Sequence, residues 1–258
     1  MSSYSRWFDE LGSGAAGTAG GKGANLGELP RAGLPVPPGF VVTVDAFRRF
    51  FEESGLAKEI AQRLERLDVD EPGALRAAAA ELQERVRRSP VPDEVRRAID
   101  EAYRALSTQD DSERGDDGAF VAVRSSATAE DTAQFSFAGM FQSFLNVRGA
   151  EALIDRVREC WASAFGARVL FYRIKQGLAD EIALAVIVQR MVDAEKSGVL
   201  FTVDPATGNP RTIVIEAAWG LGEAIVSGIV TPDNLWINKH TGEITTEYIS
   251  EKETMVVR

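Results

Sequence analysis

The sequence predicts an α+β protein in which a helix-rich first part is followed by a β-rich second part. Apolar residues recur at helical spacing between residues 75 and 106, and an aromatic stripe continues the helical pattern between residues 153 and 172. From residue 182 onward, short apolar runs alternate with Pro, Gly and Asn, which indicates largely antiparallel strands joined by turns. We therefore expect a boundary near residues 178–182, giving domains 1–180 and 181–258.

Local patterns place the individual elements. Thr43 follows a short apolar strand and can cap the next helix, whose apolar face carries Phe47, Phe50 and Phe51. The expected helices are 44–54, 75–86, 95–106 and a helical region over 150–176. The expected strands are 40–43, 120–123, 142–147, 182–192, 199–203, 212–217, 234–238 and 243–249.

Composition narrows the class of protein. The chain has 258 residues, 45% of them hydrophobic, and a net charge of -10, which is typical of a globular protein and argues against a nucleic-acid partner. No apolar run has the length of a membrane span, and the single cysteine, Cys160, cannot form a disulfide within the chain, so we expect a cytoplasmic protein. The single histidine, His240, lies in a turn signal, which argues against a multi-histidine metal site and a Ser-His-Asp hydrolase.

A cationic, hydroxyl-rich segment follows the expected strand 120–123. Arg124 comes first, then Ser125 and Ser126, and the acid pair at 130–131 follows. A strand that ends in a guanidinium and a hydroxyl-rich loop suits a polyanion. The alternative, a solvated loop in which Arg124 pairs with Asp131, stays open on spacing alone.

A glycine-rich segment near the N-terminus carries a lysine. Residues 12–17 match the GxGxxG string, but no Val/Ile-rich strand precedes them, and Gly23 stands where a Walker A loop needs Ser or Thr after its lysine. Lys22, flanked by glycines, instead comes directly before a helix-forming segment. Backbone amides and a helix N-terminus favour an anion there, whereas the alternative is a surface turn with a solvated lysine.

Two acidic residues flank a second glycine turn in the β-rich part. Glu216 and Glu223 lie on either side of Gly220 and Gly222. Carboxylates beside a phosphate cradle could hold Mg²⁺, and they are the metal-ligand candidates of this chain. Equally, Glu223 could simply cap a helix.

These segments occur in a fixed order that resembles one family. The collinear motifs are 20–28, 36–40, 123–131, 136–139, 188–192, 197–202, 218–228 and 231–233. Together they resemble the N-terminal ATP-binding domain of the phosphoenolpyruvate synthase, pyruvate phosphate dikinase and rifampin phosphotransferase family. The resemblance implies an ATP-grasp-like fold, in which two subdomains clamp a nucleotide.

The resemblance also implies roles for particular residues. The implied ATP-binding positions are Lys22, Arg124, Gly139, Ser143, Gln189, Met191 and Val192. Of these, Lys22 and Arg124 would hold the triphosphate and act in catalysis. Gly139 and Ser143 would lie in the loop that closes over it, and Gln189 to Val192 would form the hinge beside adenine.

The resemblance implies that the family reaction also requires domains other than this one. ATP, with Mg²⁺, would pass its β-phosphoryl group to a histidine on a separate swivelling domain. In a phosphoenolpyruvate synthase this phosphohistidine would then phosphorylate pyruvate. That histidine domain is the expected partner, and His240 is not assigned its role. We expect a truncated second domain, with the family's metal ligands beyond Arg258. The alternatives are the ATP-binding domain of a rifampin phosphotransferase and a free-standing nucleotide-binding module without chemistry.

Overall fold

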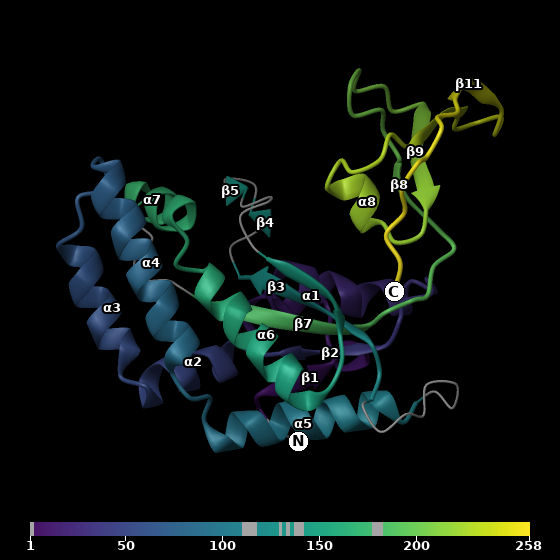
Figure 1. Ribbon diagram of the computed structural model, residues 1–258. Coiled ribbons are helices and arrows are strands. Elements are labelled where there is room, and N and C mark those ends of the chain that lie inside the picture. Colours follow the sequence, from purple (N-terminus) through teal and green to yellow (C-terminus); the bar gives the residue numbers. More distant parts are fainter. Residues whose placement is uncertain (1–2, 110–117, 129–130, 133–134, 137–141, 177–182) are drawn as a thin grey trace. The chain divides into compact units, whose positions relative to one another are not determined.

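The computed structural model contains two compact units, residues 1–191 (unit 1) and 192–258 (unit 2) (Figure 1). It describes residues 3–109, 118–128, 131–132, 135–136, 142–176 and 183–258. Unit 1 is helix-rich and unit 2 consists mainly of an antiparallel sheet, so the predicted α+β class is confirmed at this level.

Unit 1 combines helices with a five-stranded sheet. Its α-helices are α1 (Ala16–Arg31), α2 (Val44–Glu53), α3 (Leu56–Glu65), α4 (Pro72–Arg88), α5 (Asp93–Ser107), α6 (Ala150–Ser163) and α7 (Ala167–Lys175). Its strands are β1 (Ser5–Trp7), β2 (Gly39–Val42), β3 (Val121–Ala127), β6 (Ser143–Val147) and β7 (Leu184–Arg190), with the separate pair β4 (Asp131–Thr132) and β5 (Phe135–Ser136). Short 3-10 turns, η1 (Phe8–Glu10) and η2 (Ser13–Ala15), precede α1.

The sheet of unit 1 is antiparallel, with the strand order β1-β2-β7-β3-β6. β7 lies at its centre and pairs with both β2 and β3. Ile187 of β7 stands opposite Val41 on one side and Arg124 on the other, and Arg124 in turn stands opposite Ser143 of β6. Directly paired residues project to the same face, so the side chains of these four residues lie on one face of the sheet.

The two faces of this sheet are covered by different helices. On one face, Val186 and Val188 join a large core with α2 and α6, in which Phe47 and Phe50 contact Trp161. On the other, Val41, Ala185 and Ile187 pack with Ala19 of α1 and with Phe8. We call this second side the α1 face; by the strand register it also carries Arg124, Ser126 and Gln189. Figure 1 shows α6 in front of the sheet and α1 behind it.

The position of β7 differs from the expected domain division. The sequence predicts that the run beginning at residue 182 belongs to the second domain, 181–258, because its pattern matches that of the strands that follow. In the structure β7 pairs with β2 and β3 of unit 1, and the compact units divide after Met191. The strand completes a sheet whose other members come much earlier in the chain, a pairing that no local pattern records.

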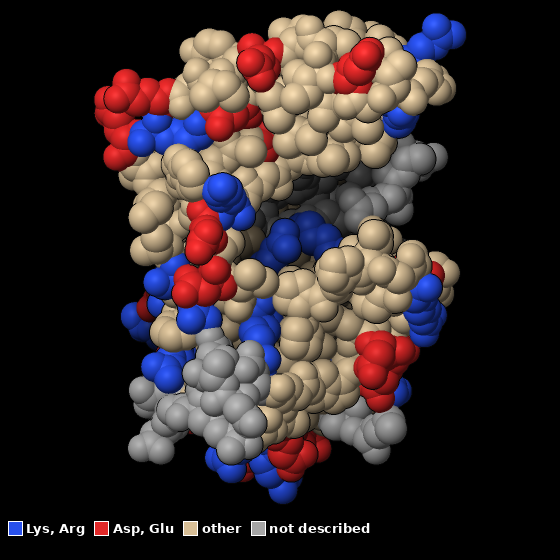
Figure 2. All heavy atoms as spheres, turned by 90° about the vertical axis from the view of Figure 1, so that its right-hand side faces the viewer, with Lys and Arg blue, Asp and Glu red and all other residues tan. Residues whose placement is uncertain are grey.

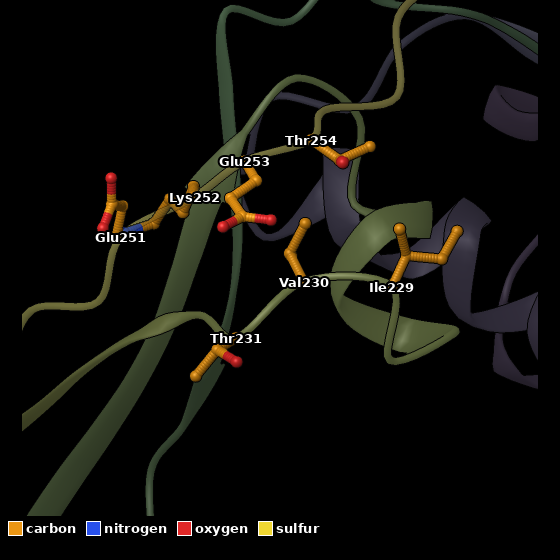
Figure 3. A pocket seen from close by; sticks show the side chains of 7 residues that line it. All are labelled: Ile229, Val230, Thr231, Glu251, Lys252, Glu253 and Thr254. Atoms are coloured by element: carbon orange, nitrogen blue, oxygen red, sulfur yellow. The ribbon is translucent and has the colours of Figure 1, made fainter.

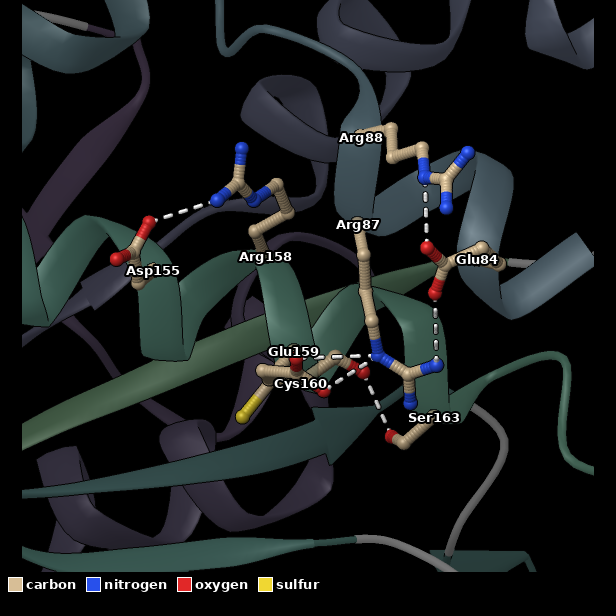
Figure 4. Close-up of polar contacts among 8 residues, drawn as sticks. All are labelled: Glu84, Arg87, Arg88, Asp155, Arg158, Glu159, Cys160 and Ser163. Atoms are coloured by element: carbon tan, nitrogen blue, oxygen red, sulfur yellow. Dashed lines mark hydrogen bonds and ion pairs between the residues drawn. The ribbon is translucent and has the colours of Figure 1, made fainter.

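The helical layer of unit 1 matches the predicted periodicity. Leu82 and Val86 of α4 are buried with Val157 and Trp161 of α6. Ion pairs join the same helices at the surface, where the Nε of Arg87 lies 3.0 Å from a carboxylate oxygen of Glu159 (Figure 4). The predicted helical region 150–176 divides into α6 and α7 around Ala164 to Gly166.

Unit 2 contains a four-stranded antiparallel sheet in the order β11-β10-β9-β8. Its elements are β8 (Lys196–Phe201), β9 (Thr212–Trp219), α8 (Glu223–Val226), β10 (Asp233–Asn238) and β11 (Ile244–Tyr248). Gly220 follows β9 with a φ of 74°, and a Cβ atom there would lie 2.2 Å from the carbonyl oxygen of Val256. The approach of residue 256 therefore explains this glycine without a ligand.

Candidate phosphate site

Lys22 lies inside α1, just after a break in the helix. Gly20, with φ 70° and ψ 170°, is the one residue of α1 with non-helical angles, so the helix restarts at Gly21. The glycine turn expected before a helix is thus a kink within a continuous helical segment. Lys22 is half-buried in the first turn after that kink.

Ser126 of β3 holds this kink against the sheet. Its Oγ accepts a hydrogen bond of 3.2 Å from the backbone amide of Gly23, which is 103 residues away in sequence. A Cβ atom at Gly20 would lie 2.3 Å from both the Oγ and the carbonyl oxygen of Ser126, so only glycine allows this approach. The structure therefore brings together the glycine segment with Lys22 and the strand with Arg124.

Arg124 is half-buried on the α1 face, two residues before Ser126. The predicted strand 120–123 extends to Ala127, so Arg124 is held within the central part of the sheet and does not begin a loop. Among the described residues, neither a hydrogen bond nor an ion pair engages its guanidinium. The side chain of Asp131, the alternative partner, lies outside the described side chains.

Many, though not all, of the other described arginines of unit 1 differ from Arg124 in this respect. Ion pairs to carboxylates engage Arg31, Arg48, Arg49, Arg63, Arg85, Arg87, Arg88, Arg96, Arg104 and Arg158. On the face shown in Figure 2, Lys and Arg side chains lie beside Asp and Glu side chains along the left edge. A half-buried guanidinium that has no such carboxylate among the described residues is a suitable donor for an anionic ligand.

Gln189 lies on the same face as Arg124, on the neighbouring strand. It stands opposite Ala122 of β3 and Gly39 of β2. Its side-chain amide donates a hydrogen bond of 3.1 Å to the carbonyl oxygen of Pro37. Because a carbonyl can only accept, this contact fixes the amide orientation and leaves the Gln189 Oε1 as an acceptor.

The other expected hinge residues have distinct environments. Met191 is 8% exposed; its backbone amide donates to the carbonyl oxygen of Phe120, and its sulfur accepts a hydrogen bond from the amide of Asn146. Val192 is 54% exposed and is the first residue of unit 2. Met191 is therefore held within unit 1, and the division between the units falls inside the expected hinge.

Of the two residues expected in the closing loop, only Ser143 lies among the described residues, and it lies in a strand. Ser143 begins β6, is exposed, and pairs with Arg124. Gly139 lies outside the described residues. Ser143 therefore shares the α1 face with Arg124 through the strand register.

The two acidic candidates occupy separate elements of unit 2. Glu216 lies in β9 opposite Val199 and Asn234, and Glu223 is the exposed first residue of α8. The N-cap of α8 is Gly222, so Glu223 does not cap the helix with its side chain. Within the described part of the chain, no three His, Cys, Asp or Glu residues form a group that could hold a metal ion. No metal ligand is therefore assigned among the described residues.

Each unit also has a pocket. That of unit 1 adjoins Gln189 through Pro37 and Gly39, and its lining is Trp7, Phe8, Asp9, Pro30, Val36, Pro37, Pro38, Gly39 and Gln109. That of unit 2 lies between residues 229–231 and 251–254 (Figure 3). The Lys252 ammonium on its wall donates to the carboxylate of Asp233 and to the carbonyl oxygen of Ser250, so its charge is already compensated.

None of the described helices combines the length and apolar character that a membrane-spanning helix needs.

A family model and similar curated proteins point to the same family. Residues 16–258 match the family described as pyruvate phosphate dikinase, AMP/ATP-binding domain. The chain is 49% identical over its whole length to a probable phosphoenolpyruvate synthase of Methanothermobacter thermautotrophicus, of which it covers 37%. It is 48% identical over 98% of its length to a probable phosphoenolpyruvate synthase of Methanocaldococcus jannaschii, covering 21% of that protein. To the phosphoenolpyruvate synthase of Pyrococcus furiosus it is 40% identical over 99% of its length, covering 35%. The chain thus spans roughly a fifth to two fifths of these relatives.

Proposed function

The chain belongs to the pyruvate phosphate dikinase AMP/ATP-binding domain family, and we propose that it holds ATP on the α1 face of unit 1. Lys22 and Arg124 would contact the triphosphate. The observation that supports this most directly is the hydrogen bond from Gly23 to Ser126, because it joins the two cationic segments on one face. A lysine supplies a point charge and an arginine a planar fork, and together they suit adjacent phosphate oxygens.

The adenine end of the site would lie toward Gln189. Because the side-chain NH₂ of Gln189 donates a hydrogen bond to the Pro37 carbonyl, the Gln189 Oε1 can accept a hydrogen bond from the exocyclic amino group of adenine. Met191 would contribute apolar surface and backbone groups, and Val192 would follow at the start of unit 2. Ser143, at the start of β6, would lie beside the phosphates, and Gly139 would close over them. In this proposal the fold is ATP-grasp-like, and units 1 and 2 are its two subdomains.

The wider reaction is proposed from the family resemblance together with the names of the relatives. A protein that carries this domain together with histidine and acceptor domains would transfer the β-phosphoryl group of ATP to the histidine and then to pyruvate, with AMP and phosphate as the other products. Phosphoryl transfer depends on positioning and on neutralising charge on the phosphate oxygens, which Lys22 and Arg124 would supply with Mg²⁺. Since the relatives are named phosphoenolpyruvate synthases, pyruvate is favoured over rifampin as the acceptor. A cytoplasmic location would supply both ATP and pyruvate.

Calorimetric titration of Mg·ATP into the wild type, Lys22→Ala and Arg124→Ala tests the proposed site. Loss of one charge-assisted contact should weaken binding by about 1.5–3 kcal/mol, or roughly tenfold to a hundredfold in Kd. Lys58→Ala and Arg66→Ala are matched controls, since both residues are exposed in or directly after α3. Wild-type affinity in folded Lys22→Ala and Arg124→Ala would remove these residues from the site.

A further inference from the structure

The hydroxyl of Ser126 occupies the place of a missing helix cap. Where a helix begins, the side chain of the residue before it commonly accepts a hydrogen bond from the second or third backbone amide. Gly20 stands at that position for the helical segment that restarts at Gly21, and it has no side chain. The third amide, that of Gly23, donates instead to Ser126 Oγ from the neighbouring strand.

We propose that Ser126 is a positioning residue, whose hydroxyl caps this helical segment and thereby sets the separation of Lys22 from Arg124. Lys22 directly precedes the capped residue, Gly23. Arg124 lies two residues before Ser126 and projects to the same face of β3. One buried hydroxyl thus connects the backbones that carry both proposed phosphate contacts.

The surroundings of Ser126 make this link a stiff one. The residue is 0% exposed, and β3 is paired with β7 along its whole length, with Ser126 opposite Ala185. On the helix side, the backbone of Gly20 lies directly against the Ser126 carbonyl and hydroxyl. Gly23 is buried as well, and a Cβ atom there would lie 3.2 Å from Cγ2 of Val41 and 2.9 Å from Cβ of Ala19. The helix start therefore has little room to shift while the hydrogen bond is made.

Replacing Ser126 with alanine can distinguish a positioning role from a general loss of stability. Ser126→Ala keeps the contact between the carbonyl of residue 126 and Gly20 but removes the hydroxyl that accepts from the Gly23 amide, so the first turn carrying Lys22 gains freedom. The inference rests on the proposed function, and it predicts that binding of the triphosphate suffers while binding of the nucleoside does not. Mg·ATP should bind about fivefold more weakly, as expected for the loss of a helix cap, and adenosine should bind within about twofold of wild type.

The experiment is a double-mutant cycle on the 258-residue chain, with Mg·ATP and adenosine as ligands. The variants are Ser126→Ala, Lys22→Ala and the double variant. Ser163→Ala is the matched control, because its Oγ is also buried but donates to the Cys160 carbonyl in α6 (Figure 4). If Ser126 acts through Lys22, Ser126→Ala should change Mg·ATP binding by less than about twofold in the Lys22→Ala background. In the absence of ligand, faster hydrogen exchange at the Gly23 amide in Ser126→Ala would support the cap itself.

The possible results are distinct. Equal weakening of Mg·ATP and adenosine, or a loss that persists fully in the Lys22→Ala background, would show a merely structural serine and overturn the inference. Unchanged Mg·ATP binding by Ser126→Ala would overturn it as well. If the wild type binds neither ligand, the proposed function fails, and the positioning role fails with it.

Discussion

Replacing Gly20 with alanine should destabilise unit 1 strongly. The φ of 70° and ψ of 170° lie in a region that is essentially restricted to glycine, which costs another residue about 1–3 kcal/mol. The new Cβ would also lie 2.3 Å from two oxygens of Ser126, one of them in the backbone of a paired strand. Relief of that contact requires α1 to move from the sheet, at a cost of about 1–3 kcal/mol for overpacking. The two terms together predict a loss of about 2–6 kcal/mol in the free energy of unfolding.

Urea denaturation of Gly20→Ala measures this loss, and Gly17→Ala is the control in the same helix. A Cβ atom at Gly17 meets nothing within 4 Å, so that substitution should be neutral or should stabilise by up to about 1 kcal/mol. In a background with Trp219→Phe and Trp236→Phe, tryptophan fluorescence reports unit 1 alone through Trp7 and Trp161. Equal stability of Gly20→Ala and Gly17→Ala would refute the close approach of α1 to Ser126.

Two further predictions concern titratable groups. The Lys252 ammonium and the Ser250 amide lower the pKa of Asp233 in the folded state, so its stabilisation of unit 2 is present above the ordinary pKa and is lost as pH falls through the folded pKa. Thermal unfolding between pH 7 and about 3 should therefore show a steeper acid-side fall in Tm for the wild type than for Asp233→Asn, and parallel curves would contradict this reasoning. Burial raises the pKa of the Cys160 thiol, so a thiol reagent at pH 8 should label the protein in urea and leave the folded protein unlabelled. Labelling of the folded protein at the denatured rate would show that α6 does not bury this side chain.

Local sequence patterns predicted much of the helical layer. The periodic apolar residues of α4 and α5 and the three phenylalanines of α2 are buried as expected, because helical periodicity is a property of each segment alone. Thr43 does occupy the N-cap of α2, but its hydroxyl donates to the Ser3 carbonyl and makes no capping bond. The N-cap position of Thr43 was predictable from the sequence, whereas the hydrogen-bond partner of its hydroxyl depends on how the N-terminal segment packs.

Contacts between distant segments were not predictable in this way. The sequence indicated that Lys22 and Arg124 could each face an anion, and each signal had a plain alternative. Neither segment indicated that Ser126 would accept from Gly23, because the two residues are far apart in the chain and the bond depends on the sheet register. The glycine pattern at 20–23 was the available signal, since a glycine before a helix can mark a close backbone approach. The place of β7 in the sheet of unit 1 was missed for the same reason.

Amide chemical-shift mapping during a titration with Mg·ATP tests the location of the nucleotide most directly. The account predicts that the largest shifts fall on Gly21 to Ala24 of α1, on Ala122 to Ser126 of β3 and on Ile187 to Met191. Amides of α3 and α4, on the opposite side of the sheet, should shift little. Saturable shifts confined to other segments would contradict a nucleotide site on the α1 face.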